Sequence, residues 1–278
     1  MPPRQLVRHD PAHGVVVSDA ATSVYYSLGS SLWTNLTNGP YAASTYSYSP
    51  PGGGWSGGEM ATMNLANWGN QGAWYSAKMR LGQALGFGQY AQSLKVGAGS
   101  GVTTTFYLSE FDQDQQQEID LEFAGHCYTN ASPCGTQSVS TNVWWQGKAY
   151  ANTATPLWTG TPPDPLPDTT AGWGSDVYRY MIDWEPDTIT WSVDLTGTGN
   201  DYVVIRSQDM SGIGTYDESL CYPFISFWQG WTPDNSPFLN GADASGNCGA
   251  SGGCYQAFYF QSLQFTPSAA NQLVQLAR

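Results

Sequence analysis

The 278-residue sequence is short of charged residues, which make up 11% of the chain, against about a quarter in average proteins. It contains 9 Lys and Arg against 22 Asp and Glu, so its formal net charge is −13. Nucleic-acid surfaces need clustered Lys and Arg to bind phosphates, and peripheral binding to anionic membranes needs them as well. The shortage of cations therefore argues against nucleic acid and membrane partners.

Residues that commonly bind metals are also few. The three histidines are scattered, and the cysteines lack the paired spacing of a zinc site. The five cysteines are Cys127, Cys134, Cys221, Cys248 and Cys254. The short spacings from 127 to 134 and from 248 to 254 favour small disulfide loops, and they leave one cysteine over. We predict no metal site and a disulfide between Cys127 and Cys134, and the pairing of the other three stays open.

Long apolar runs are absent as well, so no segment of the sequence is long and apolar enough to span a membrane. The first 14 residues have no hydrophobic signal core. Two N-glycosylation sequons, which begin at Asn35 and Asn130, are compatible with secretion. The sequons and the expected disulfide loops lead us to expect a secreted, extracellular glycoprotein.

Aromatic residues and turn formers are abundant, with 14% aromatics, 32 Gly and 17 Pro. Short alternating segments separated by turn clusters predict strands, and no long helical period is found. The clearest predicted strands are 74–80, 103–109, 178–184, 188–194, 222–228 and 255–265. They indicate an all-β sandwich or jelly roll of antiparallel sheets. We expect a flexible leader over 1–18, one domain over 19–267 and a tail over 268–278.

The most informative segment is Glu118-Ile119-Asp120-Leu121-Glu122. Because strand side chains alternate between faces, the three acids share one face and the apolar residues share the other. An exposed polar face is the ordinary alternative, but the chain has only six Glu and this segment has no Lys or Arg. Acids about 7 Å apart repel by roughly 2 kcal/mol at an effective dielectric near 20, enough to shift the pKa of one of them.

Two carboxyl groups on a rigid element suit glycoside cleavage, with one as nucleophile and one as acid/base. Asp120, between the two glutamates, can share a proton with the nucleophile and help keep the acid protonated. The Cα atoms of Glu118 and Glu122 are about 13 Å apart on a straight strand, whereas retaining chemistry needs carboxyls about 5 to 5.5 Å apart. Curvature of the strand and converging rotamers have to close that difference.

The pattern E-aliphatic-D-x-E resembles the signature of glycoside hydrolase family 16. Segments 73–81, 102–109, 141–143, 182–191 and 226–228 resemble further strands of that family, in the same order. The resemblance implies a β-jelly roll with a concave substrate cleft. It also implies that Glu118 is the nucleophile, Asp120 its helper and Glu122 the acid/base, and that Asn142 and Trp228 lie in the cleft. No cofactor is required, and a structural Ca²⁺ is compatible with the family.

Surplus tryptophans can stack on sugar rings, and our candidates are Trp144, Trp145, Trp228 and Trp231. Of the neighbours Trp144 and Trp145, one is expected in the core. Segments 178–184 and 188–194 predict a hairpin with its turn at 185–187, and the alternation of this hairpin places Trp184 and Trp191 in the core. The resemblance implies a monomeric, retaining, endo-acting hydrolase on a β-1,3- or mixed β-1,3/1,4-glucan, with a galactan backbone as an alternative. A transglycosylase of the same clan and a catalytically silent polysaccharide-binding lectin are the alternative functions.

Overall fold

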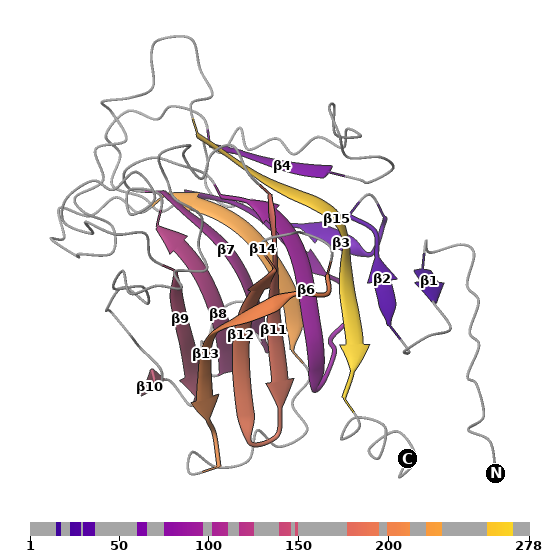
Figure 1. The fold of residues 1–278 in the computed structure, drawn as a ribbon. Helices are drawn as coiled ribbons and strands as arrows, with labels where there is room; N and C mark the ends of the chain where they lie inside the picture. Colours follow the sequence, from indigo (N-terminus) through magenta and orange to yellow (C-terminus); the bar gives the residue numbers. More distant parts are fainter. Residues whose placement is uncertain are drawn as a thin grey trace, which may run out of the picture.

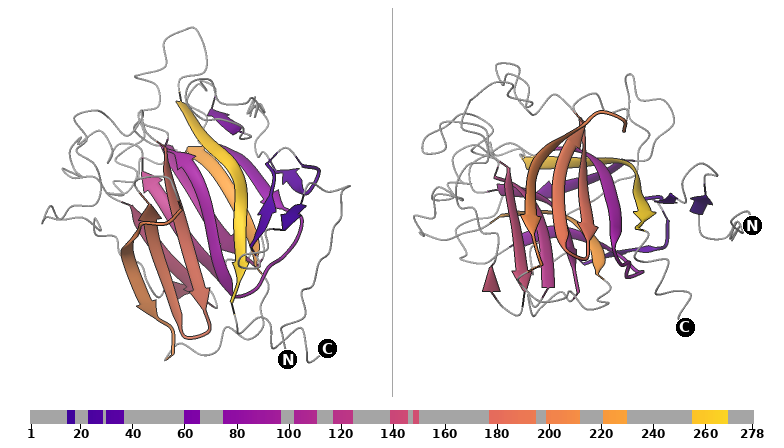
Figure 2. Two further views of the ribbon diagram at one scale, coloured as in Figure 1. Left: turned by 45° about the vertical axis from the view of Figure 1, so that its right-hand side comes forward. Right: turned by 60° about the horizontal axis from the view of Figure 1, so that its bottom comes forward.

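The computed structural model describes residues 15–17, 23–28, 30–36, 60–65, 75–96, 102–110, 117–124, 139–145, 148–149, 177–194, 199–211, 221–229 and 255–268. Every regular element within these ranges is a β-strand. No helix suited to crossing a membrane occurs in them. The strands lie in two sheets, which Figures 1 and 2 show as two layers packed face to face.

The larger sheet has eight strands in the order β1-β2-β15-β6-β11-β12-β13, with β4 also paired to β15. Its strands are β1 (Val15–Val17), β2 (Val24–Tyr26), β4 (Met60–Leu65), β6 (Gly88–Lys95), β11 (Tyr178–Glu185), β12 (Thr188–Asp194), β13 (Tyr202–Asp209) and β15 (Tyr255–Pro267). This sheet is the front layer in Figure 1.

The smaller sheet has seven strands in the order β10-β9-β8-β7-β14-β5-β3. Its strands are β3 (Trp33–Asn35), β5 (Tyr75–Leu81), β7 (Val102–Ser109), β8 (Gln117–Ala124), β9 (Ser140–Trp145), β10 (Lys148–Ala149) and β14 (Tyr222–Gln229). All strand pairs in both sheets are antiparallel. The predicted all-β sandwich of two antiparallel sheets is therefore confirmed.

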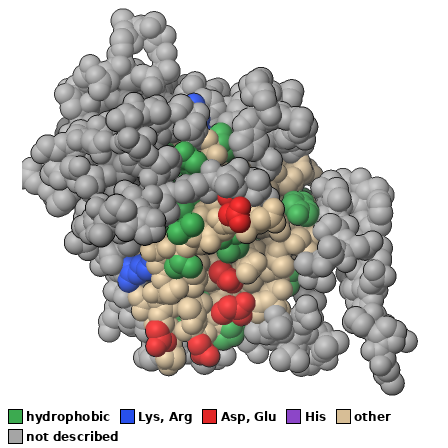
Figure 3. Space-filling view, viewed as in Figure 1, with side chains coloured by type: hydrophobic (Ala, Val, Ile, Leu, Met, Phe, Trp, Pro, Cys, Tyr) green, Lys and Arg blue, Asp and Glu red, His purple; other side chains and the backbone are tan. Residues whose placement is uncertain are grey.

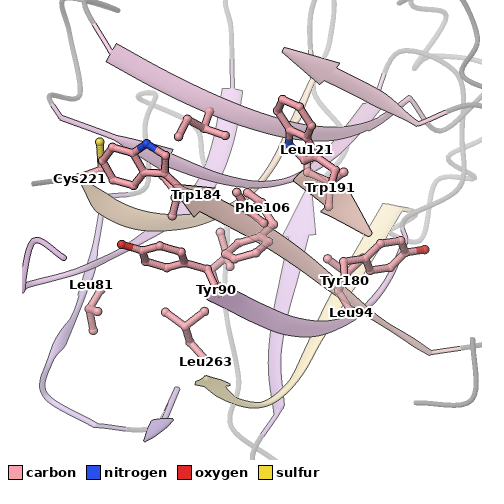
Figure 4. Close-up of a cluster of buried hydrophobic side chains, with 14 of the residues drawn as sticks. Leu81, Tyr90, Leu94, Phe106, Leu121, Tyr180, Trp184, Trp191, Cys221 and Leu263 are labelled. Atoms are coloured by element: carbon pink, nitrogen blue, oxygen red, sulfur yellow. The ribbon is translucent and has the colours of Figure 1, made fainter. Parts of the chain in front are cut away.

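The core lies between the sheets, and Figure 4 shows a cluster of its buried side chains, among them Tyr90, Phe106, Leu121 and Trp184. Trp184 and Trp191, from the β11–β12 hairpin, are fully buried, as their alternation predicts. The ring of Phe123 on β8 meets that of Tyr180 on β11 edge to face, with centroids 4.7 Å apart. This contact between the layers fixes the inner face of β8 against the larger sheet.

The six predicted strands are all present, with ends that differ by a few residues. The hairpin turn consists of Pro186 and Asp187, since β11 continues through Glu185. Strands β2, β3, β4, β6, β10 and β13 were not predicted. The short strand β1 lies inside the segment 1–18 that was expected to be a leader, and it pairs with β2. Residues 1–14 and 269–278 lie outside the described residues.

Gly88, the first residue of β6, has φ +150° and lies against β15. A Cβ at this position would come within 2.5 Å of the backbone oxygen of Thr266 and within 2.8 Å of the Phe265 ring. Because real Cβ atoms do not approach a backbone oxygen that closely, only glycine allows β6 and β15 to pair here.

The outer face of the larger sheet is acidic near the β11–β12 turn. Figure 3 shows acidic side chains on this face, and the described acids here are Asp183, Glu185, Asp187 and Asp209.

Two arginines of this sheet donate hydrogen bonds to neighbours. Arg179 donates to the Tyr202 hydroxyl at 3.0 Å, and Arg206 donates to Gln208 Oε1 at 2.9 Å.

Replacing Trp184 with Ala is expected to destabilise the fold by about 3–5 kcal/mol, because it leaves a large cavity between the sheets. Val204→Ala on β13 is the control, since Val204 is 56% exposed. The control is expected to change stability by no more than about 0.5 kcal/mol. Urea denaturation of the three proteins measures both effects, and equal midpoints for Trp184→Ala and the unmodified protein would contradict the assigned core.

Candidate active site

The acidic segment forms β8, in the interior of the smaller sheet between β7 and β9. Ile119, Leu121 and Phe123 are fully buried in the core. Glu118, Asp120 and Glu122 therefore lie on the opposite face, which points away from the larger sheet. We call this face the outer face of the smaller sheet. Its acids are mounted on a strand whose other side is fixed by packing.

Each acid has a register partner on both neighbouring strands. On β7, Ser109 pairs with Glu118, Tyr107 with Asp120 and Thr105 with Glu122. On β9, the partners in the same order are Trp144, Asn142 and Ser140. The acids are thus flanked by hydroxyl, amide and aromatic side chains, and no cation stands directly opposite any of them.

Burial changes the protonation of Glu122 most clearly. It raises the pKa of Glu122 from 4.5 to about 8, and the nearby charge of Glu118 acts in the same direction. Glu122 is half-buried. A carboxyl group with this pKa carries its proton at neutral pH, as a general acid requires.

Asp120 is also held in its neutral form. Burial raises its pKa well above the ordinary range, followed by the charges of Glu118 and Glu122 and by a hydrogen bond with Glu118. Asp120 is 5% exposed. In its neutral form Asp120 donates that hydrogen bond to the Glu118 carboxylate. The three acids are therefore not equivalent, because Glu118 accepts a hydrogen bond while Asp120 and Glu122 retain protons.

The surface beside the acids is built from buried polar and aromatic groups of β7 and β14. The hydroxyls of Thr105 and Ser226 form a hydrogen bond, and both residues are 2% exposed. One register step along, the rings of Tyr107 and Phe224 stack with centroids 4.7 Å apart and an angle of 9° between their planes. These contacts give the acids a rigid neighbourhood.

The predicted substrate-binding residues are divided between the two faces. Asn142, Trp144 and Trp228 share the outer face with the acids, and Trp144 and Trp228 are half-buried. The Oδ1 atom of Asn142 accepts a hydrogen bond from the Val143 backbone N–H at 2.9 Å. Trp145 was predicted to contact substrate, but it packs against the hydrophobic core. The register of β9 places Trp145 opposite Gln117, which alternates with the outward-facing Glu118 and so lies on the inner face of the sheet. Trp145 is therefore the core member of the Trp144–Trp145 pair.

Two further predictions concern residues outside the described ranges, namely Trp231 and the Cys127–Cys134 disulfide. Cys221, at the start of β14, is buried and unpaired in the described structure. Burial raises the pKa of its thiol well above the ordinary value. Cys221 therefore behaves as a small apolar residue of the core.

Sequence reasoning missed four residues of the outer face, Lys78, Arg80, Tyr107 and Tyr222. The alternation of segment 73–81 could have indicated Lys78 and Arg80, because they alternate with the buried Ala77, Met79 and Leu81. Their alignment with the acids, however, depends on strand order and register, which one sequence does not reveal.

Within the described ranges, no three His, Cys, Asp or Glu side chains are arranged to hold a metal ion. The structural Ca²⁺ and the expectation that no cofactor is required both stay predictions.

Comparison with known families decides the classification. Residues 54–244 match the family described as glycosyl hydrolases family 16. The chain belongs to this family. The family consists of glycan-active enzymes of the glycosidase type.

Several curated proteins are similar to part of the chain. A Crh-like protein CRH11 from Candida albicans is 30% identical over 152 residues, which cover 54% of this chain and 27% of that protein. Xyloglucan endotransglycosylase/hydrolase protein 8 from Oryza sativa subsp. japonica is 33% identical over 110 residues, which cover 39% of this chain and 32% of that protein. The chain thus matches about a third or less of these relatives' length.

Solved structures confirm the fold of the family 16 chain. A Bacillus licheniformis β-glucanase superimposes with a TM-score of 0.55 at 15% identity, covering 87% of this chain and 94% of the other. The Crh5 transglycosylase in complex with NAG gives a TM-score of 0.53 at 19% identity, covering 85% and 79%. The shared architecture is the two-sheet jelly roll.

The raised pKa of Glu122 predicts how activity depends on pH. Its protonated form predominates below about pH 8, so kcat/KM is expected to fall as the pH rises through about 8. The measurement is a pH profile of kcat/KM on an unactivated β-glucan oligosaccharide, whose leaving group needs the proton. The control, Glu122→Gln, is assayed on an aryl β-glycoside, where it should show no alkaline limb and keep measurable activity, because an activated leaving group needs little protonation. A limb centred near pH 4.5 would show that Glu122 has an ordinary carboxyl pKa.

Proposed function

We propose that the protein is a retaining, endo-acting hydrolase of a β-linked glucan that works by double displacement. In this proposal Glu118 is the nucleophile, Glu122 the acid/base and Asp120 the positioning helper. The backbone is a β-1,3- or mixed β-1,3/1,4-glucan, and the enzyme acts outside the cell as a monomer. The observation that carries the proposal is three acids aligned on one face of a rigid strand and made unequal because burial raises the pKa of Asp120 and of Glu122.

The first step uses that inequality directly. An oxygen of the Glu118 carboxylate attacks the anomeric carbon while Glu122 gives its proton to the departing glycosidic oxygen. The products are a covalent glycosyl-enzyme and a shortened polysaccharide with a free hydroxyl. Glu118 loses its negative charge in the ester, so the Asp120 hydrogen bond weakens and no longer stabilises a charge on Glu118.

The second step reverses the roles. Glu122, now ionised, takes a proton from water, and the water oxygen attacks the anomeric carbon and displaces Glu118. The pKa of Glu122 falls when the charge of Glu118 disappears, because that charge is one of the two causes that raise it. The group is then a base for the second step and regains its acid character when Glu118 is released.

Side chains on both sides of β8 are suited to hold sugar rings. Trp144 stands opposite Glu118 on β9, and Trp228 lies on β14, two strands away on the other side. A polysaccharide lying across the strands would contact both tryptophans and pass over the acids between them. This arrangement supports cleavage within a chain, since binding groups lie on both sides of the acids.

The names of the relatives favour one alternative, transglycosylation. The Crh5 structure is named as a transglycosylase, and the rice relative is named as an endotransglycosylase/hydrolase. The two reactions share the glycosyl-enzyme and differ only in whether water or a sugar hydroxyl attacks it. A silent lectin is less well supported, because a binding protein has no use for three repelling acids that are costly to bury.

The proposal predicts reducing-end release from polysaccharides. Laminarin, barley mixed-linkage glucan, xyloglucan and agarose form the panel, each with and without a labelled oligosaccharide acceptor. We expect release from at least one of the two named glucans, none with Glu118→Gln, and a reduction of about 10²–10⁴-fold with Glu122→Gln. Transfer to the acceptor in preference to hydrolysis would assign the protein as a transglycosylase. Silence of the unmodified protein on the whole panel, with binding retained, would favour the lectin.

A further inference from the structure

We propose that Arg80 and Lys78 of β5 bind a single negatively charged substituent on the polysaccharide. The substituent is a carboxylate, or a sulfate or phosphate ester, on an otherwise neutral chain. The inference rests on the proposed function, because it takes the outer face of the smaller sheet as the surface that binds substrate. It names a site on that surface and the chemistry that the site selects.

The two cations lie in register with the acids. Ala77, Met79 and Leu81 are buried in the core, so Lys78 and Arg80 lie on the outer face. Register pairs connect Asp120 through Tyr107 and Phe224 to Arg80. A parallel series connects Glu122 through Thr105 and Ser226 to Lys78. Three interstrand steps make each separation about 14 Å, which places the cations along a polysaccharide that crosses the strands over the acids.

Aromatic rings orient both cations. The guanidinium of Arg80 lies 4.8 Å from the centroid of the Tyr222 ring, and Lys78 Nζ lies 5.9 Å from that of Phe224. Phe224 is itself fixed by its stack on Tyr107. Cations resting on aromatic faces are held in place without losing their positive charge. The site is therefore organised before any ligand arrives.

Arg80 lacks partners of the kind that the other described arginines have. Its Nε is buried and has no hydrogen-bond acceptor among the described residues. Within the same residues the guanidinium forms no ion pair, whereas Arg179 and Arg206 both donate to side chains of their own sheet. A buried donor without an acceptor is costly, and a ligand oxygen would remove that cost.

The composition of the site indicates the charge of its ligand. Lys and Arg only donate hydrogen bonds, whereas a sugar hydroxyl both donates and accepts. A site built on two donors matches a group that only accepts, such as a carboxylate, sulfate or phosphate. The Cα atoms of Lys78 and Arg80 are about 7 Å apart on one strand, so a single anion can lie within reach of both side chains. The net charge of −13 disfavours a densely charged polymer and favours isolated substituents.

The test measures binding with turnover removed. The full-length chain carrying Glu118→Gln is titrated with neutral laminarin and barley glucan, and with lightly carboxymethylated, sulfated and phosphorylated forms of each. Affinity electrophoresis and calorimetry report the dissociation constants. We expect tighter binding of at least one substituted form, by about tenfold, and we expect added salt to weaken this preference. The derivative that binds most tightly identifies the substituent.

Matched variants assign the preference to the site. In the Glu118→Gln background, Arg80→Met should remove most of the preference, and Arg80→Lys should restore part of it. Lys95→Met is the control, because it removes one positive charge from β6 of the larger sheet and should leave the preference intact. Thermal melting and circular dichroism check folding, and Lys78→Gln supplies an independent reduction if Arg80→Met does not fold.

Three results would overturn the inference: equal affinity for neutral and substituted glucans, equal loss of preference in Lys95→Met and Arg80→Met, or no binding of any form. Failure of the proposed function is a separate result. It would be seen as no reducing-end release by the protein with Glu118 intact, while charge-selective binding persists.

Discussion

Three acids on one face of β8 repel one another, and the strand tolerates this because its other face is fixed in the core. Ile119, Leu121 and Phe123 are fully buried, and the contact of Phe123 with Tyr180 joins β8 to the larger sheet. The acids cannot move apart or out of the packed sheet, so their burial, and after it their repulsion, raises the pKa of Asp120 and Glu122, and these two acids retain their protons. The packing of the sandwich thus produces the unequal carboxyl groups that the proposed chemistry uses.

The outer face of the smaller sheet carries its acids and its cations on different strands. Acids stand on β8, cations on β5, and aromatic and hydroxyl side chains of β7 and β14 lie between them. At about 14 Å these acids and cations do not form ion pairs with each other. The arginines described in the larger sheet differ, because Arg179 on its outer face and Arg206, which faces the smaller sheet, both donate hydrogen bonds to side chains. Sequence alternation thus places opposite charges on one surface, and strand order sets the distance between them.

The alternation of residues along single strands predicted the features that depend on neighbouring residues alone. It predicted the faces of β8, the β11–β12 hairpin and the burial of Trp184 and Trp191. It missed β6, whose inward positions include the polar Gln92, and β13, whose Val203 and Val204 are exposed at a sheet edge. It could not predict that Tyr107 and Asn142 flank Asp120. Their positions depend on the order and register in which β7 and β9 pair with β8, and a single sequence does not reveal either. The misplacement of Trp145 has the same origin, because the choice between two adjacent tryptophans needs that register.

The central claim is that Glu118 attacks the anomeric carbon while Glu122 supplies the proton. The configuration of the first product tests it most directly, because two displacements at one carbon restore the original configuration and a single displacement inverts it. NMR of the newly formed reducing end, recorded before mutarotation, distinguishes the two outcomes on whichever glucan is cleaved. The account predicts a β-configured first product from the β-linked substrate, and an α-configured first product would contradict it.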